Sequence, residues 1–436
     1  MKILNRYILT EFIKSFIISM LIVYSILIMQ LMIKLLDRFL GKGFSFSFLG
    51  ELLFYNTAWI LAMAIPMAIL VASILTYGKL SANNEIVGFN SSGIRTINII
   101  TPSLVVAIVI SSLTIYFSCN ILPKMNYKSR KLNYELRKKR PDVAFEENIY
   151  SNLIPNHTIK FDRRDKNNKS KFHDIIIHQT MHNTLKRTIA SDSVIINSNN
   201  TNIMLDLHNG TIHERLALNE EYRKIDFGNY KLTIPIDKTN NRKMSYVRGD
   251  RELTFSMLKH VNDSLSKNII YLKKKINKRL HLFNMDTLNV NYATLVDFID
   301  KQNNDSLLKL NDIARQKVFK IKSKANKTII SGYLKNIERN LNKMNRNKVE
   351  IHKKFSIPIA SIIFIFIGAP LGIIIRRGNL AVSMAISLMF FVLYYILIVG
   401  GEQLADRNLF TPAYSMWMPN IIVLIFGYII IKITKK

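Results

Sequence analysis

Residues 52–78 read LLFYNTAWILAMAIPMAILVASILTYG and contain no Asp, Glu, Lys or Arg. An α-helix rises about 1.5 Å per residue and the hydrocarbon core of a bilayer is about 30 Å thick, so roughly twenty apolar residues suffice to cross it. This stretch is longer than that. It therefore predicts a membrane-spanning helix.

Five further stretches also lack acidic and basic residues. They are residues 15–33, 96–123, 355–375, 378–401 and 408–431. A soluble protein would have to bury all six as core helices, because exposing them would present more apolar surface than solubility allows. We therefore expect six transmembrane helices in an α+β membrane protein, three within residues 1–123 and three within residues 351–436.

Basic residues in the short loops between these spans predict the orientation of the chain. If the N-terminus is cytoplasmic, the cytoplasmic loops and ends carry more Lys and Arg residues than the short loops on the opposite side do. Lys79 and Arg95 are among the cytoplasmic ones. Both termini are therefore expected in the cytoplasm. The polar segment 124–354, between the third and fourth spans, is then expected on the outer side.

Most of the formal net charge of +31 lies in this outer segment. Lys and Arg neutralise phosphates, so a basic balance often indicates a nucleic-acid partner. On the outer side of a membrane, however, the phosphates belong to lipid or glycolipid headgroups, and we expect an anionic lipid and no nucleic acid. A compositional preference for Lys, Asn and Ile is the alternative explanation of the charge.

The first part of the outer segment, residues 124–251, is predicted to be a β-domain. Between residues 149 and 236, short runs of alternating apolar and polar residues are separated by turn-forming residues, which is typical of strands. Asn209-Gly210 is predicted to form a hairpin turn, because both residues tolerate positive φ. Several short strands in one domain indicate a β-sandwich or jelly roll.

The second part of the outer segment, residues 252–350, is predicted to be helical, because the apolar period changes from two to about three and a half. Apolar stripes over 258–276 and 314–344 predict two amphipathic helices that pair as an antiparallel hairpin or short coiled coil. A basic cluster lies on or beside the first stripe. It could dock on phosphorylated lipid, or it could simply form the solvent-exposed face of the helix. Its members are Lys273, Lys274, Lys275, Lys278 and Arg279.

The sequence shows no catalytic or metal-binding pattern. Gly88 to Gly93 comes nearest to a phosphate-binding loop but lacks the following Lys and Ser or Thr. His173 and His178 are five residues apart and face opposite sides of a strand, which does not suit a metal. No Asp, Glu, His or Lys lies within a span to bind a coupling ion. We expect no enzyme activity, no cofactor and no metal, and an external source of energy.

The loop between the second and third spans, residues 79–95, is the candidate for receiving that energy. It predicts one short amphipathic helix that ends at Gly93, which can adopt a left-handed cap. Such a helix could fit a groove of an ATPase and pass its motion to the spans, with Glu85 pairing with a basic residue of the partner. An ordinary connecting loop is the alternative.

Several motifs resemble those of the LptF/LptG (YjgP/YjgQ-like) permease family of lipopolysaccharide exporters. The coupling segment of that family has an acidic residue, Glu85 here, followed by a small-residue pattern. Its fourth span has a basic entry with proline and a glycine-proline-leucine-glycine exit. The matching stretches in this chain are residues 4–9 with Phe12, 84–94, 205–210, 352–358 and 368–372.

This resemblance implies an inner-membrane permease subunit of an ABC transporter that extracts lipopolysaccharide. The implied partners are a cytoplasmic ABC ATPase dimer, a paralogous permease subunit and a periplasmic jelly-roll bridge protein. ATP would be hydrolysed in the separate ATPase subunit. Basic residues at the outer end of the first span, here Lys34 and Arg38, would contact lipid phosphates. The residues implied in ATPase coupling are Glu85, Gly88, Ser92, Gly93 and Arg95.

Two other classes of function fit a chain of this kind. A permease of the macrolide-exporter or cell-division type would transmit force without moving lipid, although such proteins usually place the large outer domain after the first span. A membrane-anchored scaffold would need no coupling loop. The helical segment from about Arg251 to Asn347 departs from the family pattern, because the family's return to the fourth span is shorter.

Overall fold

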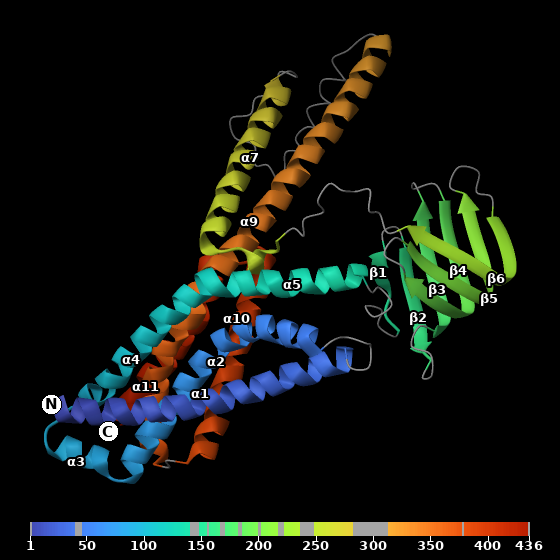
Figure 1. Cartoon of the computed structure of the whole chain (residues 1–436). Helices are drawn as coiled ribbons and strands as arrows, with labels where there is room; N and C mark the ends of the chain where they lie inside the picture. The colour runs from blue at the N-terminus through green and yellow to red at the C-terminus, as the bar shows by residue number, and fades with distance from the viewer. Residues whose placement is uncertain are drawn as a thin grey trace. The chain divides into compact units, whose positions relative to one another are not determined.

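The computed structural model describes residues 2–39, 46–139, 148–154, 157–165, 171–181, 185–198, 202–216, 222–235, 248–281, 313–376 and 379–434. The chain divides into two compact units. The first comprises Met1–Ile26, Trp59–Lys124 and Gly249–Lys436, and the second comprises Leu27–Ala58 and Met125–Arg248. Figure 1 labels the helices and strands.

Six helical segments are long and apolar enough to cross a membrane, as the sequence predicts. They are α1 (Lys2–Phe39), α2 (Phe46–Ala82), the continuous run of α4 (Thr96–Tyr116), η1 (Phe117–Ile121) and α5 (Leu122–Lys139), α9 (Ile313–Ile375), α10 (Leu380–Asp406) and α11 (Pro412–Thr434). Each charge-free run of the sequence falls within or largely within one of these segments. The six expected spans are therefore confirmed as helices of the required length and composition.

The fourth span is part of a much longer helix. α9 has 63 residues, and its first two thirds precede the apolar run that begins at Phe355 (Figure 1). Gly332 is the one glycine between Ile313 and Phe355, and no proline occurs there, so nothing in the sequence interrupts the helix. The boundary that we expected at residue 350 therefore lies inside a single continuous helix.

α7 (Phe255–His281) packs antiparallel to the part of α9 that precedes the fourth span. Their shared core contains Ile269, Leu272, Ile276, Ile330 and Ile337, which belong to the two predicted apolar stripes. At one end Asn347 donates to Asn262 over 2.9 Å, and at the other Arg279 donates to Asn326 over 3.4 Å. Residues 282–312, which connect the two helices in sequence, lie outside the described part of the chain.

The described strands form one six-stranded antiparallel sheet in the order β1-β2-β3-β4-β5-β6. They are β1 (Ser151–Ile154), β2 (His157–Arg164), β3 (Lys171–Met181), β4 (Leu185–Ser198), β5 (Asn202–Leu216) and β6 (Tyr222–Pro235). Each strand pairs only with its neighbours in sequence, so the strands form a meander. A jelly roll has two sheets linked by Greek-key connections, and this strand order has none among the described strands.

The sheet folds over along a line that crosses its longer strands. In β5 the buried residues are Ile203, Leu205 and Leu207 before the line and Ile212 after it, so the buried side changes from odd-numbered to even-numbered residues. The ladder to β4 skips one pair at the same point, between Ser191↔Gly210 and Ser193↔His208. The register is the same on both sides of the gap and Asn209 has a positive φ there, so the strand bends without a bulge. The two arms therefore enclose one apolar core, as in a sandwich.

Asn209-Gly210 lies at this line, and the prediction of a hairpin turn there is wrong. β5 continues through both residues without reversing direction. Asn209 does have a positive φ of 50°, but the positive φ serves a bend within the strand. A Cβ atom on Gly210 would lie 2.2 Å from the Ala190 carbonyl oxygen, so the bend needs glycine because the neighbouring strand approaches closely.

Candidate coupling site

A short helix, α3 (Glu85–Ser91), lies between the second and third spans. α2 continues through Lys79 to Ala82, and Asn84, with a φ of 58°, then redirects the chain. α3 ends at Ser91, and Gly93 follows two residues later with a φ of 78° and an N–H that donates to the Asn90 carbonyl. The glycine cap is confirmed. The predicted single helix over 79–95 is wrong, because the Asn84 turn divides it.

α3 is anchored by one apolar face. Ile86 is buried, and Phe89 and Ile94 are partly buried against a cluster of residues from four helices. That cluster includes Ile8 and Phe12 of α1, Tyr77 and Leu80 of α2, Ile99 of α4, and Ile365 and Ala369 of α9. The opposite face of α3 is open, since the Val87 side chain is 55% exposed. A force applied to the open face would therefore reach four of the six spans.

The Glu85 carboxylate accepts hydrogen bonds from a residue of α1 and from a residue just before α3. Its Oε1 accepts hydrogen bonds from the Tyr7 hydroxyl over 3.3 Å and from Asn83 Nδ2 over 3.1 Å. Nearby in sequence, Lys79 forms an ion pair with Glu11 of α1. The sequence did not predict the contacts of Tyr7 and Glu11 with this segment, because no local sequence pattern shows that α1 packs against a loop more than sixty residues away.

The other predicted coupling residues lie on the open surface of this segment. Gly88, Ser92, Gly93 and Arg95 are all exposed. The Ser92 hydroxyl donates to the Gly88 carbonyl over 2.9 Å, which satisfies a carbonyl at the end of the helix. A Cβ atom on Gly88 would meet no atom within 4 Å. Glycine is therefore not needed there for packing within the chain, and the space is available to a partner.

Close contact between α2 and α9 connects this segment to the fourth span. A Cβ atom on Gly372 would lie 2.7 Å from the Ile74 carbonyl oxygen and 2.9 Å from the Gly78 nitrogen. Gly368, one turn earlier, faces Ser73 in the same way. Small residues four apart allow helix backbones to approach closely in membranes. Ser81 adds a hydrogen bond of 2.9 Å to the Ile373 carbonyl.

A network of four charges joins η2 (Asp250–Glu252) to α9 and α10. Arg251 contacts Glu350 Oε1 at 3.3 Å and Glu402 Oε1 at 2.8 Å, and Lys353 contacts Glu402 Oε2 at 2.7 Å. Partial burial would lower the pKa of the Arg251 guanidinium, but the carboxylates of Glu350 and Glu402 outweigh it and raise the pKa. Arg251 therefore stays charged and holds the start of the α7 segment against two spans.

We expect Glu402→Gln to lower the thermal stability of the purified protein, because Arg251 and Lys353 both lose a charged acceptor. The Glu402 side chain is only 17% exposed, so the expected loss is about 1–3 kcal/mol. Thermal unfolding in detergent measures it. Glu338→Gln is the matched control, since Glu338 is an exposed acid of α9. Equal midpoints for the two variants would contradict the role of the network.

The predicted lipid-binding residues Lys34 and Arg38 lie near the end of α1, in the second compact unit. They are four residues apart and so occupy one side of the helix. Lys34 is exposed, and no acid in the described part of the chain lies within ion-pair distance of it. The side chain of Arg38 lies outside the described residues. The two positions therefore belong to a different compact unit from α3.

The chain matches a family model and is similar to a known protein. The family model described as "Lipopolysaccharide export system permease LptF/LptG" matches residues 6–433 of the chain. The chain is also similar to "Uncharacterized protein RP871" of Rickettsia prowazekii (strain Madrid E), with 25% identity over 216 residues. This second match covers 49% of the chain and 59% of the relative, less than two thirds of the relative's length.

Proposed function

Since the chain belongs to the lipopolysaccharide export permease LptF/LptG family, we propose that it is the permease subunit of an ATP-driven exporter that extracts lipopolysaccharide from the inner membrane. The observation that carries the proposal is the extent of the family match, from residue 6 to residue 433, which includes all six spans and the folded sheet. The energy would come from a separate ABC ATPase dimer in the cytoplasm.

The ATPase would dock on α3. The apolar face of α3 is fixed to four spans while its other face is open, so a partner could grip the helix without unpacking it. Glu85, Gly88, Ser92, Gly93 and Arg95 would form the contact surface. Close α2–α9 packing at Gly372 would pass movement of this segment to the fourth span.

The other partners would meet the remaining surfaces. α1 presents exposed apolar side chains, including Ile17, Leu21 and Met29, which a membrane-embedded protein covers with lipid or with another helix. We assign part of this surface to a paralogous permease subunit. The segment 124–354 would be periplasmic, with both termini cytoplasmic, and its folded sheet would pass lipid to jelly-roll strands of a bridge protein.

We expect replacement of both Lys34 and Arg38 by Ala to weaken photocrosslinking of lipopolysaccharide to the first span by several-fold. The reason is that each basic residue near a charged lipid surface contributes about 1 kcal/mol of attraction. The measurement uses the assembled complex in membranes, with the photoreactive group at Ile33. Arg6→Ala together with Lys432→Ala is the control for loss of charge, because both residues are exposed. An unaltered signal in the Lys34 and Arg38 variant would remove these residues from the lipid site.

One observation favours a second candidate, a permease that transmits force without moving lipid. The fourth span is the C-terminal third of α9, and the rest of this 63-residue helix precedes it without interruption. A long continuous helix of this kind could transmit motion from the span to an outer partner. The same crosslinking experiment separates the two functions. A force-transmitting permease would give no lipopolysaccharide adduct at the first span in the unmodified protein.

A further inference from the structure

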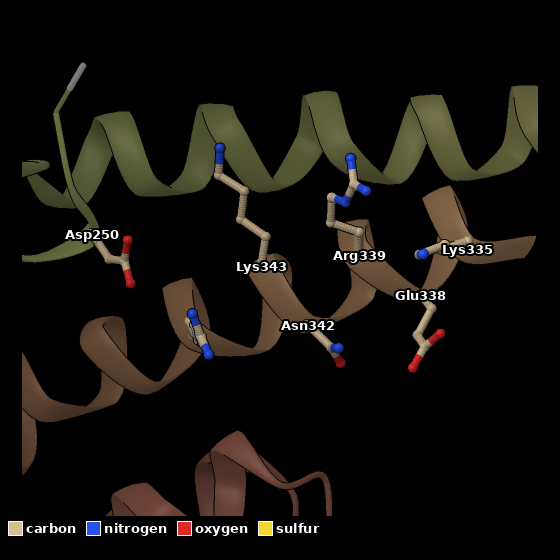
Figure 2. Close-up of a pocket in the computed structure, with 7 residues that line it drawn as sticks. Asp250, Lys335, Glu338, Arg339, Asn342 and Lys343 are labelled. Carbon is tan, nitrogen blue, oxygen red and sulfur yellow. The ribbon is translucent and has the colours of Figure 1, made fainter. Parts of the chain in front are cut away.

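A basic hollow lies along the outer part of α9, beside η2 (Figure 2). It is lined by Asp250, Lys335, Glu338, Arg339, Asn342, Lys343 and Arg346, and its volume is about 530 Å³. Six of these residues belong to α9, which is also the helix of the fourth span. The hollow therefore has a fixed position relative to that span.

The charges of the hollow are strongly unbalanced. Lys335, Arg339 and Lys343 are spaced four residues apart, so they share one side of the helix, where like charges repel. Figure 2 shows the Arg339 and Lys343 side chains extending to the same side, while Glu338 points the other way. Within the described ranges, no acid lies within ion-pair distance of any of these three cations. An anion bound among them would relieve the repulsion.

The basic cluster of α7 differs, because part of it is used in packing. The Lys275 ammonium lies 4.7 Å from the centre of the Tyr271 ring and 5.9 Å from that of Tyr333. Arg279 donates to Asn326 of α9. These two cations help to hold α7 on α9. The α9 hollow is therefore the better candidate for an external anion.

The distance of the hollow from the membrane-spanning part of α9 indicates which kind of anion could bind in it. At about 1.5 Å per residue, positions 335–346 lie roughly 14–30 Å along α9 from the start of the apolar run. The headgroup layer of an ordinary bilayer extends only about 5–8 Å beyond the hydrocarbon core. Phosphates of common phospholipids would lie below the hollow. A lipid with a large phosphorylated saccharide headgroup would reach it.

We propose that this hollow binds phosphate groups on the large headgroup of a membrane amphiphile as it leaves the bilayer. The inference rests on the proposed function, in which that amphiphile is lipopolysaccharide, and adds a second contact site beyond the first span. Lys335, Arg339 and Lys343 supply charge-assisted hydrogen bonds to the phosphate oxygens. Free phosphate has the same chemistry, so the test must distinguish the two sources.

The test places a photoreactive residue at Glu338, which lines the hollow, and a second one at Ile33 in the first span. The full-length protein, in its assembled complex, is placed in nanodiscs that contain lipopolysaccharide. We expect lipid adducts at both positions. Lys335→Ala, Arg339→Ala and Lys343→Ala together should reduce the adduct at position 338 by about tenfold or more and leave the adduct at position 33 largely unchanged. Dephosphorylated lipopolysaccharide should label position 338 as weakly as the triple variant does.

The matched control replaces Lys322, Lys324 and Lys348, three exposed lysines of the same helix that do not line the hollow. An equal loss of labelling in this control would overturn the proposal, because general charge would explain the effect. Binding of inorganic phosphate to the hollow without any lipid adduct at position 338 would also overturn it, because the site would then serve free phosphate. Crosslinking of position 338 to a protein, with no lipid adduct there, would overturn the proposal as well. A lipid adduct at position 33 alone would reject the hollow as a lipid site and retain the proposed permease function. Lipid adducts at neither position would reject both the hollow as a lipid site and the permease function.

Discussion

Glu85→Lys is expected to abolish the coupling of ATP hydrolysis to lipopolysaccharide release while the chain remains folded. The substitution reverses the charge at the edge of the open face of α3, where a basic residue of the ATPase is proposed to bind. Like charges placed across an interface cost several kcal/mol, which corresponds to a loss of affinity of at least about a hundredfold. The measurement is ATP-driven release of lipopolysaccharide from reconstituted complexes, together with co-purification of the ATPase.

Glu85→Gln is the matched variant, because a glutamine oxygen can still accept the hydrogen bonds from Tyr7 and Asn83. If the negative charge matters to the ATPase, this variant should lose part of the coupling and Glu85→Lys should lose all of it. Thermal unfolding of the isolated permease should change little in either variant. Normal export by Glu85→Lys would refute the coupling role of this residue.

Gly372→Leu is expected to prevent the correct assembly of the spans. The atoms that a side chain would meet at this position are backbone atoms of α2, at 2.7 and 2.9 Å from the Cβ, and backbone cannot rotate away as a side chain can. The two helices would have to separate, at an expected cost of about 3 kcal/mol or more. The yield of folded protein in membranes and its unfolding temperature in detergent measure the effect.

Gly332→Leu is the control for this substitution, because Gly332 lies on the same helix and a Cβ atom there would meet nothing within 4 Å. Replacing a glycine inside a helix by a better helix former is expected to stabilise it by about 0.5–1 kcal/mol. A similar fall in the unfolding temperature for both variants would show that the α2–α9 contact is not the cause.

The spans could be predicted from the sequence because their signal is local. Charge-free runs such as residues 52–78 contain all the information needed to assign a membrane-spanning helix. The bend of the sheet could not be predicted in the same way. Asn209 has the positive φ that its type suggests, but a hairpin and a bend both use that conformation. Only the pairing of β4 with β5 decides between them.

The candidate site was predicted in part for a similar reason. The Gly93 cap follows from the local sequence, and the acidic position of Glu85 matches a family pattern. Tyr7, which donates to Glu85, comes from the other end of the N-terminal region, and no periodicity connects the two. Likewise, the glycines of residues 368–372 were recognised as a motif, but their close approach to Ser73 and Gly78 required the packing of α2 against α9.

The unbroken course of α9 has a mechanical consequence. The part of the helix that precedes Phe355 is on the order of 60 Å long, so a change in the tilt of the fourth span would move the far end of the helix through a larger distance. A tilt of the fourth span by about 5° would displace the far tip by roughly 5 Å. In the proposed exporter, small rearrangements of the spans would therefore become larger movements of the basic hollow and of the end of α9 beyond it.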